Sequence, residues 1–245
     1  MNTSQTLEEL KTLRLNGMYE HYAQVLKMPV HELPDTHELI AMLTQSELLN
    51  KTNRRAQINV KNARFRYQAS VEGIDYHPDR GINKSQLQTL ASCHFIEKGD
   101  NLIITGATGC GKSYIATALG YRACSLGFKT LYLNMPWLDE QLLISEADAS
   151  KVKYLNKLSR TQLLIFDDFG LNNMTHRMRM ALLQIMEDRY ERKSIIITSQ
   201  LPIDTWYEYI GEPTLADAIM DRLSASANRL ELSGESLRKK FKQNM

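Results

Sequence analysis

Apolar residues in the first part of the chain recur three or four positions apart, which is the spacing of an amphipathic helix. They predict one helix through Leu7, Leu10, Leu13, Leu15, Met18, Tyr22, Val25 and Leu26. Two prolines, Pro29 and Pro34, then interrupt the pattern. A second helix is expected from Asp35 or Thr36, either of which can cap it, and its apolar residues lie between positions 39 and 49.

Short apolar runs alternate with helical patterns in the rest of the chain. The runs predict strands at 101–105, 130–134, 163–166, 195–198 and 229–232, and the stretches between the first four predict helices at 112–126, 136–159 and 175–192. Strands divided by helices form right-handed βαβ units, so we expect an α/β fold with a parallel sheet flanked by helices. The segment 73–81 resembles a linker, which places a small helical domain at 1–70 and the α/β domain at 71–245.

Composition bears on the compartment of the protein and on membrane association. The 245 residues carry 28 acidic and 30 basic side chains, so net charge alone indicates no particular partner. Three cysteines, Cys93, Cys110 and Cys124, lack the spacing of a metal site and fit a reducing compartment. The sequence shows neither a signal pattern nor an apolar run long enough to span a bilayer. We therefore expect a cytoplasmic protein without a membrane partner.

A phosphate-binding loop follows the apolar run at 101–105. Residues 106–113 fit the pattern G-x-x-x-x-G-K-[ST], and a helical stretch comes next. Glycines let the backbone curl so that N–H groups point at phosphate oxygens, and the helix directs its positive end at the same place. Lys112 would reach the β- and γ-phosphates of ATP, and the Ser113 hydroxyl would bind Mg²⁺. The predicted nucleotide-binding residues are Gly106, Ala107, Thr108, Gly109, Cys110, Gly111, Lys112, Ser113 and Tyr114.

Two adjacent acids, Asp167 and Asp168, end the apolar run at 163–166. A buried parallel strand would deliver Asp167 to the carboxyl edge of the sheet beside the phosphate loop, where it can orient Mg²⁺ through water. Asp168 is then placed to polarise the water that attacks the γ-phosphate, which is the role of a general base. The alternative interpretation of such a pair is a cap for the following helix.

Further candidates follow the later strands. Ser199 and Gln200 end the run at 195–198, and either side chain could hydrogen-bond the γ-phosphate or the attacking water. Guanidinium groups suit the spread negative charge of a transferring phosphoryl group. The candidate arginines are Arg222, Arg229 and Arg238.

Two stretches rich in cations are candidates for contact with the DNA backbone. Residues 51–66 hold six cations and no acid, interleaved with aromatic residues, and residues 151–160 hold four cations. Backbone binding of this kind depends on salt and is largely indifferent to sequence. The competing interpretation of each stretch is a solvated helix face. The residues chosen are Lys51, Arg54, Arg55, Lys61, Arg64, Lys151 and Lys153.

The order of these motifs resembles that of the AAA+ superfamily, and within it the clade of helicase loaders and replication initiators. The basic stretch, the segment 74–76 and the segments 166–170, 221–223 and 234–238 are most similar to the IstB family, the ATP-binding helpers of insertion-sequence transposition. The resemblance covers almost the whole chain.

The resemblance implies an AAA+ ATPase core with Asp167 at the metal and Asp168 as the base, although many members have Glu at the second position. Gln200 stands at the first sensor position, where the family more often shows Asn. Arg222 matches the arginine finger that acts across a subunit boundary, and Arg238 matches the second sensor. The family further implies a homo-oligomer that assembles on double-stranded DNA with ATP and recruits or stimulates a cognate transposase. A replicative helicase loader of the DnaC type is the alternative, and a small-molecule kinase and a non-hydrolysing scaffold are more distant ones.

Overall fold

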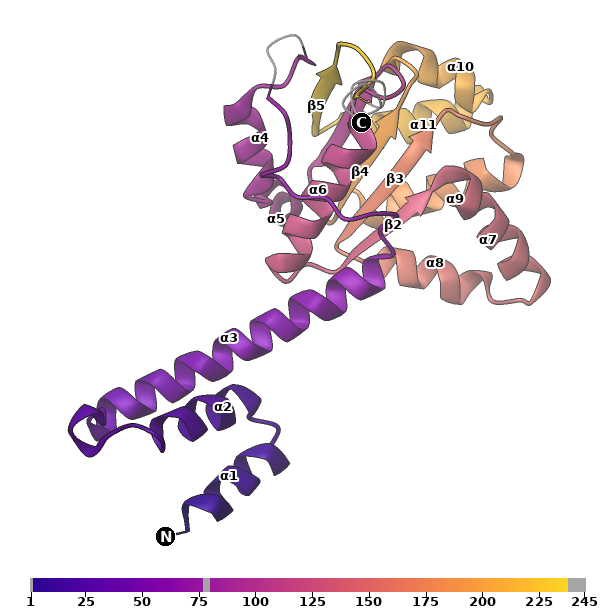
Figure 1. Ribbon diagram of the computed structural model, residues 1–245. Helices are drawn as coiled ribbons and strands as arrows, with labels where there is room; N and C mark the ends of the chain where they lie inside the picture. The colour runs from indigo at the N-terminus through magenta and orange to yellow at the C-terminus, as the bar shows by residue number, and fades with distance from the viewer. Residues whose placement is uncertain (1, 77–79, 238–245) are drawn as a thin grey trace. The chain divides into compact units, whose positions relative to one another are not determined.

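The computed structural model describes residues 2–76 and 80–237 (Figure 1). The chain forms two compact units, residues 1–58 and 59–245. None of the helices in the described ranges is long and apolar enough to cross a membrane.

The first unit is helical. It contains α1 (Thr3–Thr12), α2 (Asn16–Val25), the 3-10 helix η1 (Val30–Glu32) and the greater part of α3 (Thr36–Ala63). The prediction of one helix across residues 7–26 is wrong, because the chain turns between α1 and α2, where Arg14 has a φ of 58°. The predicted second helix and most of the basic stretch form the single helix α3.

A contact from α3 explains where α2 begins. The side chain at the N-cap position, Leu15, makes no capping hydrogen bond. Instead, the buried carboxylate of Glu47 accepts the backbone N–H groups of Gly17 at 2.8 Å and Met18 at 3.2 Å. A negative charge at a helix N-terminus is favourable, and it satisfies donors that have no partner within the helix. A Cβ on Gly17 would lie 2.4 Å from the carbonyl oxygen of Ser46, so this close approach requires glycine.

The compact units divide earlier than the expected boundary at 70/71, which stays a prediction. Residues that follow α3 pack on the α/β unit. Phe65 stacks on Tyr121 with ring centroids 4.4 Å apart, and Ala69 and Ile74 are buried in the hydrophobic core of that unit. The segment is therefore part of the packed second unit.

The second unit is built on a five-stranded parallel sheet, as predicted. Its strands lie in the order β2-β3-β4-β1-β5. They are β1 (Asn101–Gly106), β2 (Thr130–Asn134), β3 (Leu163–Phe169), β4 (Ser194–Ser199) and β5 (Ala227–Leu232). This order places β4 between β1 and β3, so the ends of the three strands that carry the predicted motifs are neighbours.

Helices cover both faces of the sheet (Figure 1). On one face lie α4 (Lys84–Ala91), α5 (His94–Lys98) and α6 (Lys112–Ser125), and on the other α7 (Met135–Ala147), α8 (Lys151–Arg160), α9 (His176–Arg189) and α11 (Pro213–Ser224). The short helices η3 (Ile203–Thr205) and α10 (Trp206–Ile210) precede α11. The predicted helix at 136–159 is two helices, because the chain turns at Ala149, which has a φ of 57°.

Alternation along the strands gives the sheet its two cores. Leu102 and Ile104 of β1 pack with α4, α5 and α6, whereas Ile103 packs with the helices of the other face. Successive side chains of a strand point to opposite faces, and burial on both sides explains why the strands are apolar throughout. The sheet is therefore a rigid support for the polar groups at its carboxyl edge.

Candidate active site

The phosphate loop connects the carboxyl end of β1 to the first turn of α6, as the pattern predicts. Its three glycines, Gly106, Gly109 and Gly111, have positive φ values of 144°, 84° and 98°. Lys112 is only 6% exposed, and its ammonium group donates to the carbonyl oxygens of Gly106 and Ala107, each at 2.8 Å. The loop thus curls around the lysine, and the N-terminus of a long helix lies directly behind it.

Asp167 is the most tightly held acid of the site. It is 1% exposed, and three hydroxyl groups donate to its carboxylate: Ser113 at 2.7 Å, Thr198 and Tyr132. Burial raises the pKa of the Tyr132 hydroxyl, and the charge of Asp167 raises it further, so the tyrosine stays a donor. The Ser113 hydroxyl and the Asp167 carboxylate are hard oxygen donors in contact, a combination that suits Mg²⁺.

Asp168 lies on an irregularity of β3. Phe166 pairs with Ile197 but Phe169 pairs with Ser199, so β3 contains one extra residue. Asp168 takes up this bulge with a φ of 62°. Its carboxylate accepts from the Asn134 side chain at 2.8 Å, at the end of β2. Burial raises the pKa of Asp168, and the neighbouring charge of Asp167 raises it further, while the bond from Asn134 opposes both effects.

The two candidates for the sensor position differ in their surroundings. Ser199 is buried, donates to the carbonyl oxygen of Phe169 at 2.6 Å and accepts from the backbone N–H of Leu201. Gln200 is exposed, and its side-chain oxygen accepts from the hydroxyl of Thr108 in the phosphate loop at 2.6 Å. The geometry favours Gln200, because Ser199 is occupied within the fold.

Arg222, the candidate arginine finger, lies apart from the phosphate loop. Arg222 is on the last turn of α11, where it donates to Glu187 at 3.2 Å and to the carbonyl oxygen of Ala218 at 2.8 Å. Arg229 is exposed on β5, and Arg238 lies outside the described residues.

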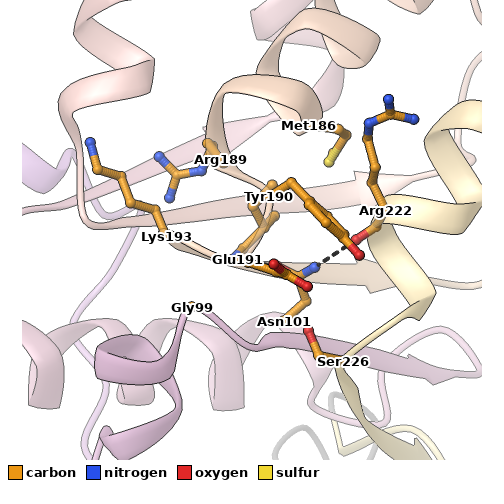
Figure 2. Close-up of a pocket in the computed structure, with 10 residues that line it drawn as sticks. Gly99, Asn101, Met186, Arg189, Tyr190, Glu191, Lys193, Arg222 and Ser226 are labelled. Carbon is orange, nitrogen blue, oxygen red and sulfur yellow. Dashed lines mark hydrogen bonds between the residues drawn. The ribbon is translucent and has the colours of Figure 1, made fainter.

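Arg222 lines a pocket at the amino edge of the sheet, beside Asn101 (Figure 2). The side chain of Asn101 donates to the carbonyl oxygens of Arg222 at 3.4 Å and Leu223 at 3.3 Å. Asn101 begins β1, and Gly106 ends it. A parallel strand rises about 3.3 Å per residue, so about 16 Å separates the two ends. An arginine side chain does not span that interval, and Arg222 therefore does not reach the phosphate loop of its own chain.

The other predicted residues are scattered. The ring of Tyr114 faces Tyr67 with centroids 6.3 Å apart, rather than the phosphate loop. The exposed cations of α3 share the spacing of one helix face, and these are Lys51, Arg54, Arg55 and Lys61. Lys51 forms an ion pair with Glu47 at 3.5 Å. Arg64 lies over the ring of Trp137.

In the second basic stretch, Lys151 pairs with Glu146 at 2.7 Å, whereas Lys153 is exposed. Within the described parts of the chain no group of three or more His, Cys, Asp or Glu residues could hold a metal ion by itself. Cys93, Cys110 and Cys124 are free and buried.

The family of IstB-like ATP binding proteins matches residues 8–245. The chain belongs to this family. A relative from Sinorhizobium fredii named as the insertion sequence ATP-binding protein y4pL is 39% identical over 234 residues, which covers 96% of each chain. The insertion sequence IS1162 ATP-binding protein of Pseudomonas fluorescens is 36% identical over 206 residues, 84% of this chain and 89% of the relative. The chain is thus an AAA+ ATPase of the IstB-like family.

Solved structures of DnaI and DnaA share the fold. The crystal structure of DnaI has a TM-score of 0.59 with 22% identity, covering 68% of this chain and 92% of DnaI. AMPPCP-bound DnaA from Aquifex aeolicus has a TM-score of 0.57 with 17% identity, covering 74% of this chain and 56% of DnaA. At these identities the likeness concerns the fold alone. The α/β fold of this IstB-like chain is therefore shared with DnaI and DnaA.

Several residues of this IstB-like site carry no signal in the sequence, or only a faint one. Tyr132 and Thr198 bind the carboxylate of Asp167, and Asn134 binds that of Asp168. Arg80 donates to the carbonyl oxygen of Cys110 in the phosphate loop at 2.6 Å. Thr198 gives a faint signal as a polar residue inside an apolar run. The other three contacts depend on how the strands and the loop are arranged in space, and no local motif marks them.

Proposed function

We propose that this ATPase is a transposition helper that binds double-stranded DNA, assembles on it with ATP and recruits or stimulates a partner transposase. It would act in the cytoplasm as a homo-oligomer. The observation that carries the proposal is the match to insertion sequence ATP-binding proteins over nearly the whole chain, 96% in the relative from Sinorhizobium fredii. The helical unit is included in that match, whereas the likeness to DnaI covers 68% of the chain.

The chemistry follows from the carboxyl edge of the sheet. The N–H groups of the loop and the ammonium of Lys112 hold the β- and γ-phosphates. Ser113 and Asp167 would hold Mg²⁺, which when bound neutralises charge on the phosphate oxygens. Asp168 accepts a proton from water as the water oxygen bonds to the γ-phosphorus and the bond to the bridging oxygen of ADP breaks. Gln200 orients the γ-phosphate or that water.

Asp168 suits the role of base because of its surroundings. Its pKa is raised by burial and by the charge of Asp167, which makes its carboxylate a better proton acceptor than an ordinary exposed one. The donor Asn134 fixes one oxygen of the carboxylate, so the other is available to the water. The side chain is therefore oriented before the reaction begins.

A second subunit completes the proposed site. Arg222 does not reach the phosphate loop of its own chain, so as an arginine finger it would enter the site of a neighbouring copy. A contact that places different surfaces of identical subunits together produces rings or open helical filaments. The arrangement supports ATP-dependent assembly, because ATP bound in one subunit would be contacted by Arg222 of the neighbouring subunit.

The exposed cations of α3 support DNA binding by the assembly. Lys51, Arg54, Arg55 and Lys61 recur along one helix face, and phosphates of a duplex are the natural partners of such a row. Arg64, Lys151 and Lys153 extend the proposed set. Lys51 and Lys151 already pair with acids, so their contribution is expected to be smaller than that of Arg54 and Arg55.

The proposal is tested with a random-sequence duplex and a candidate partner transposase. Sedimentation velocity should show a large complex on the duplex with ATP and no such complex with ADP. Insertion of a labelled transposon end by the transposase should rise when protein and ATP are both added. The Lys112→Ala variant is the matched control and should do neither. If wild-type protein hydrolyses ATP but neither assembles on DNA nor stimulates insertion, the proposed function is wrong.

A further inference from the structure

We propose that Arg80 is a positioning residue of the ATPase site, which fixes the direction of the Gly111 N–H in the phosphate loop. This arginine lies outside the phosphate loop and outside the segments that resemble the IstB family. It lies in the segment that precedes α4, and it acts through the loop rather than on the nucleotide.

Arg80 is buried in contact with the loop. The residue is 7% exposed, which is rare for an arginine outside an ion-pair network. One terminal nitrogen donates to the carbonyl oxygen of Cys110 at 2.6 Å, and the other donates to the carbonyl oxygen of Asp75 at 3.0 Å. The Asp75 carboxylate lies 3.8 Å from the guanidinium and is largely exposed. The guanidinium is therefore held between the loop and the segment that leads into the unit.

The bond to Cys110 has a consequence for the next residue. A trans peptide unit is planar, and its C=O and N–H groups point in opposite directions. When Arg80 holds the Cys110 carbonyl toward itself, the N–H of Gly111 is turned to the other side of the loop, where the phosphates bind. A charged donor makes a stronger hydrogen bond than a neutral one, so the orientation is firmly set.

Glycine at position 111 accommodates this contact. Gly111 has a φ of 98°, and a Cβ there would lie 2.8 Å from a terminal nitrogen of Arg80. Any side chain would have to displace the guanidinium. The φ of 98° already favours glycine at this point of the loop, and the close approach of Arg80 adds to that preference.

A second contact acts in the same way one peptide earlier. The backbone N–H of Leu237 donates to the carbonyl oxygen of Gly109 at 3.0 Å. The backbone of Arg80 is itself held, because its carbonyl oxygen accepts from the backbone N–H of Ser233 at 3.1 Å. Two segments distant in sequence therefore hold carbonyl groups of the loop from outside it, and among the described residues Arg80 is the one that does so with a charged side chain. Lys112 donates to two other loop carbonyls, but it belongs to the loop itself and its ammonium is the group that meets phosphate.

The proposal predicts a change in binding rather than in chemistry. The loop holds the β-phosphate in both the ground state and the transition state, so its distortion weakens uniform binding. Arg80→Gln should raise the Kd for ADP and the KM for ATP about 10- to 100-fold, the usual range for one charged hydrogen bond. The kcat at saturating ATP should stay within about twofold of that of the parent protein. Arg80→Lys, which keeps a charged donor, should recover part of the affinity.

Arg189→Gln is the matched control. Arg189 is also a buried arginine, 1% exposed, and donates to four backbone carbonyl groups away from the phosphate loop. Its replacement should lower the melting temperature without changing the ADP Kd of the folded fraction. ADP binding is measured by calorimetry and folding by thermal unfolding for all three variants. Unchanged ADP affinity in folded Arg80→Gln protein would overturn the proposal. So would a fall in kcat at constant KM, because that pattern indicates a smaller folded fraction.

Discussion

Replacing Arg222 by alanine is expected to separate ATP binding from ATP hydrolysis. In its own chain Arg222 pairs with Glu187, and their side chains are 28% and 52% exposed. Exposed pairs of this kind contribute about 0–1 kcal/mol to stability. The variant should therefore fold normally. It should also bind ATP normally, because about 16 Å of β1 lies between the amino edge, where Arg222 is found, and the phosphate loop.

Hydrolysis by Arg222→Ala should nevertheless fall on the order of 10³-fold, the effect of removing an arginine finger in other phosphoryl-transfer enzymes. Lys112→Ala fails for the opposite reason, because it lacks a competent pocket but keeps the finger. A mixture can therefore contain pockets from one variant completed by fingers from the other.

The expected rescue can be calculated from the geometry. Each site uses one subunit for the pocket and the adjacent one for the finger. Lys112→Ala alone should not assemble, but where the two variants enter a common assembly at random and in equal amounts, the productive order has a chance of about one half times one half, so about a quarter of the sites should be active. Rescue should decline on either side of that ratio. The assay is phosphate release in the presence of duplex DNA, with the two variants titrated at constant total protein.

Co-sedimentation of differently tagged variants provides the control for mixed assembly. If the variants assemble together and no mixture hydrolyses ATP, then Arg222 is not a finger in trans. Activity of Arg222→Ala alone near the wild-type rate would refute the reasoning directly.

Three further predictions concern the pocket and the DNA surface. Lys112→Ala should abolish ATP binding in calorimetry, and normal affinity would contradict the assigned role. Asp168→Asn should bind ATP but hardly hydrolyse it. In the parent protein the hydrolysis rate should rise with pH as Asp168 loses its proton, at a pH above the usual range for aspartate because the pKa of Asp168 is raised. A pH profile without this rise would exclude Asp168 as the base. Changing Arg54, Arg55, Lys61 and Arg64 to alanine should reduce the salt dependence of duplex binding by about 0.9 in log–log slope for each phosphate that the variant no longer neutralises, and an unchanged slope would shift the interface to residues 151–160.

Local patterns were sufficient to predict the framework of the second unit. Each apolar run forms a strand within a few residues of the expected position. A strand that is buried on both faces must be apolar along its whole length, so its sequence is easy to identify. The phosphate loop was equally clear, because its glycines and its lysine are fixed by contacts within one short segment. The position of β4 between β1 and β3 agrees with the same motifs, because it brings their polar ends together.

Features that depend on distant residues could not be predicted. The break before α2 is stabilised by Glu47, thirty positions away from Gly17, and no local signal near Leu15 marks a cap. The bulge at Asp168 requires a backbone φ of 62°. Aspartate can adopt this conformation, but an aspartate in the sequence does not predict it. Arg80 is an ordinary cation in the sequence, and only the fold brings it to Cys110.

Asn101 gives β1 a mechanical role. It ties the amino end of the strand to the last turn of α11, and the phosphate loop leaves from the other end. A strand that is hydrogen-bonded to a neighbour on each side keeps a fixed length. If Arg222 enters the site of the next copy, the length of β1 contributes to the interval between consecutive ATP molecules.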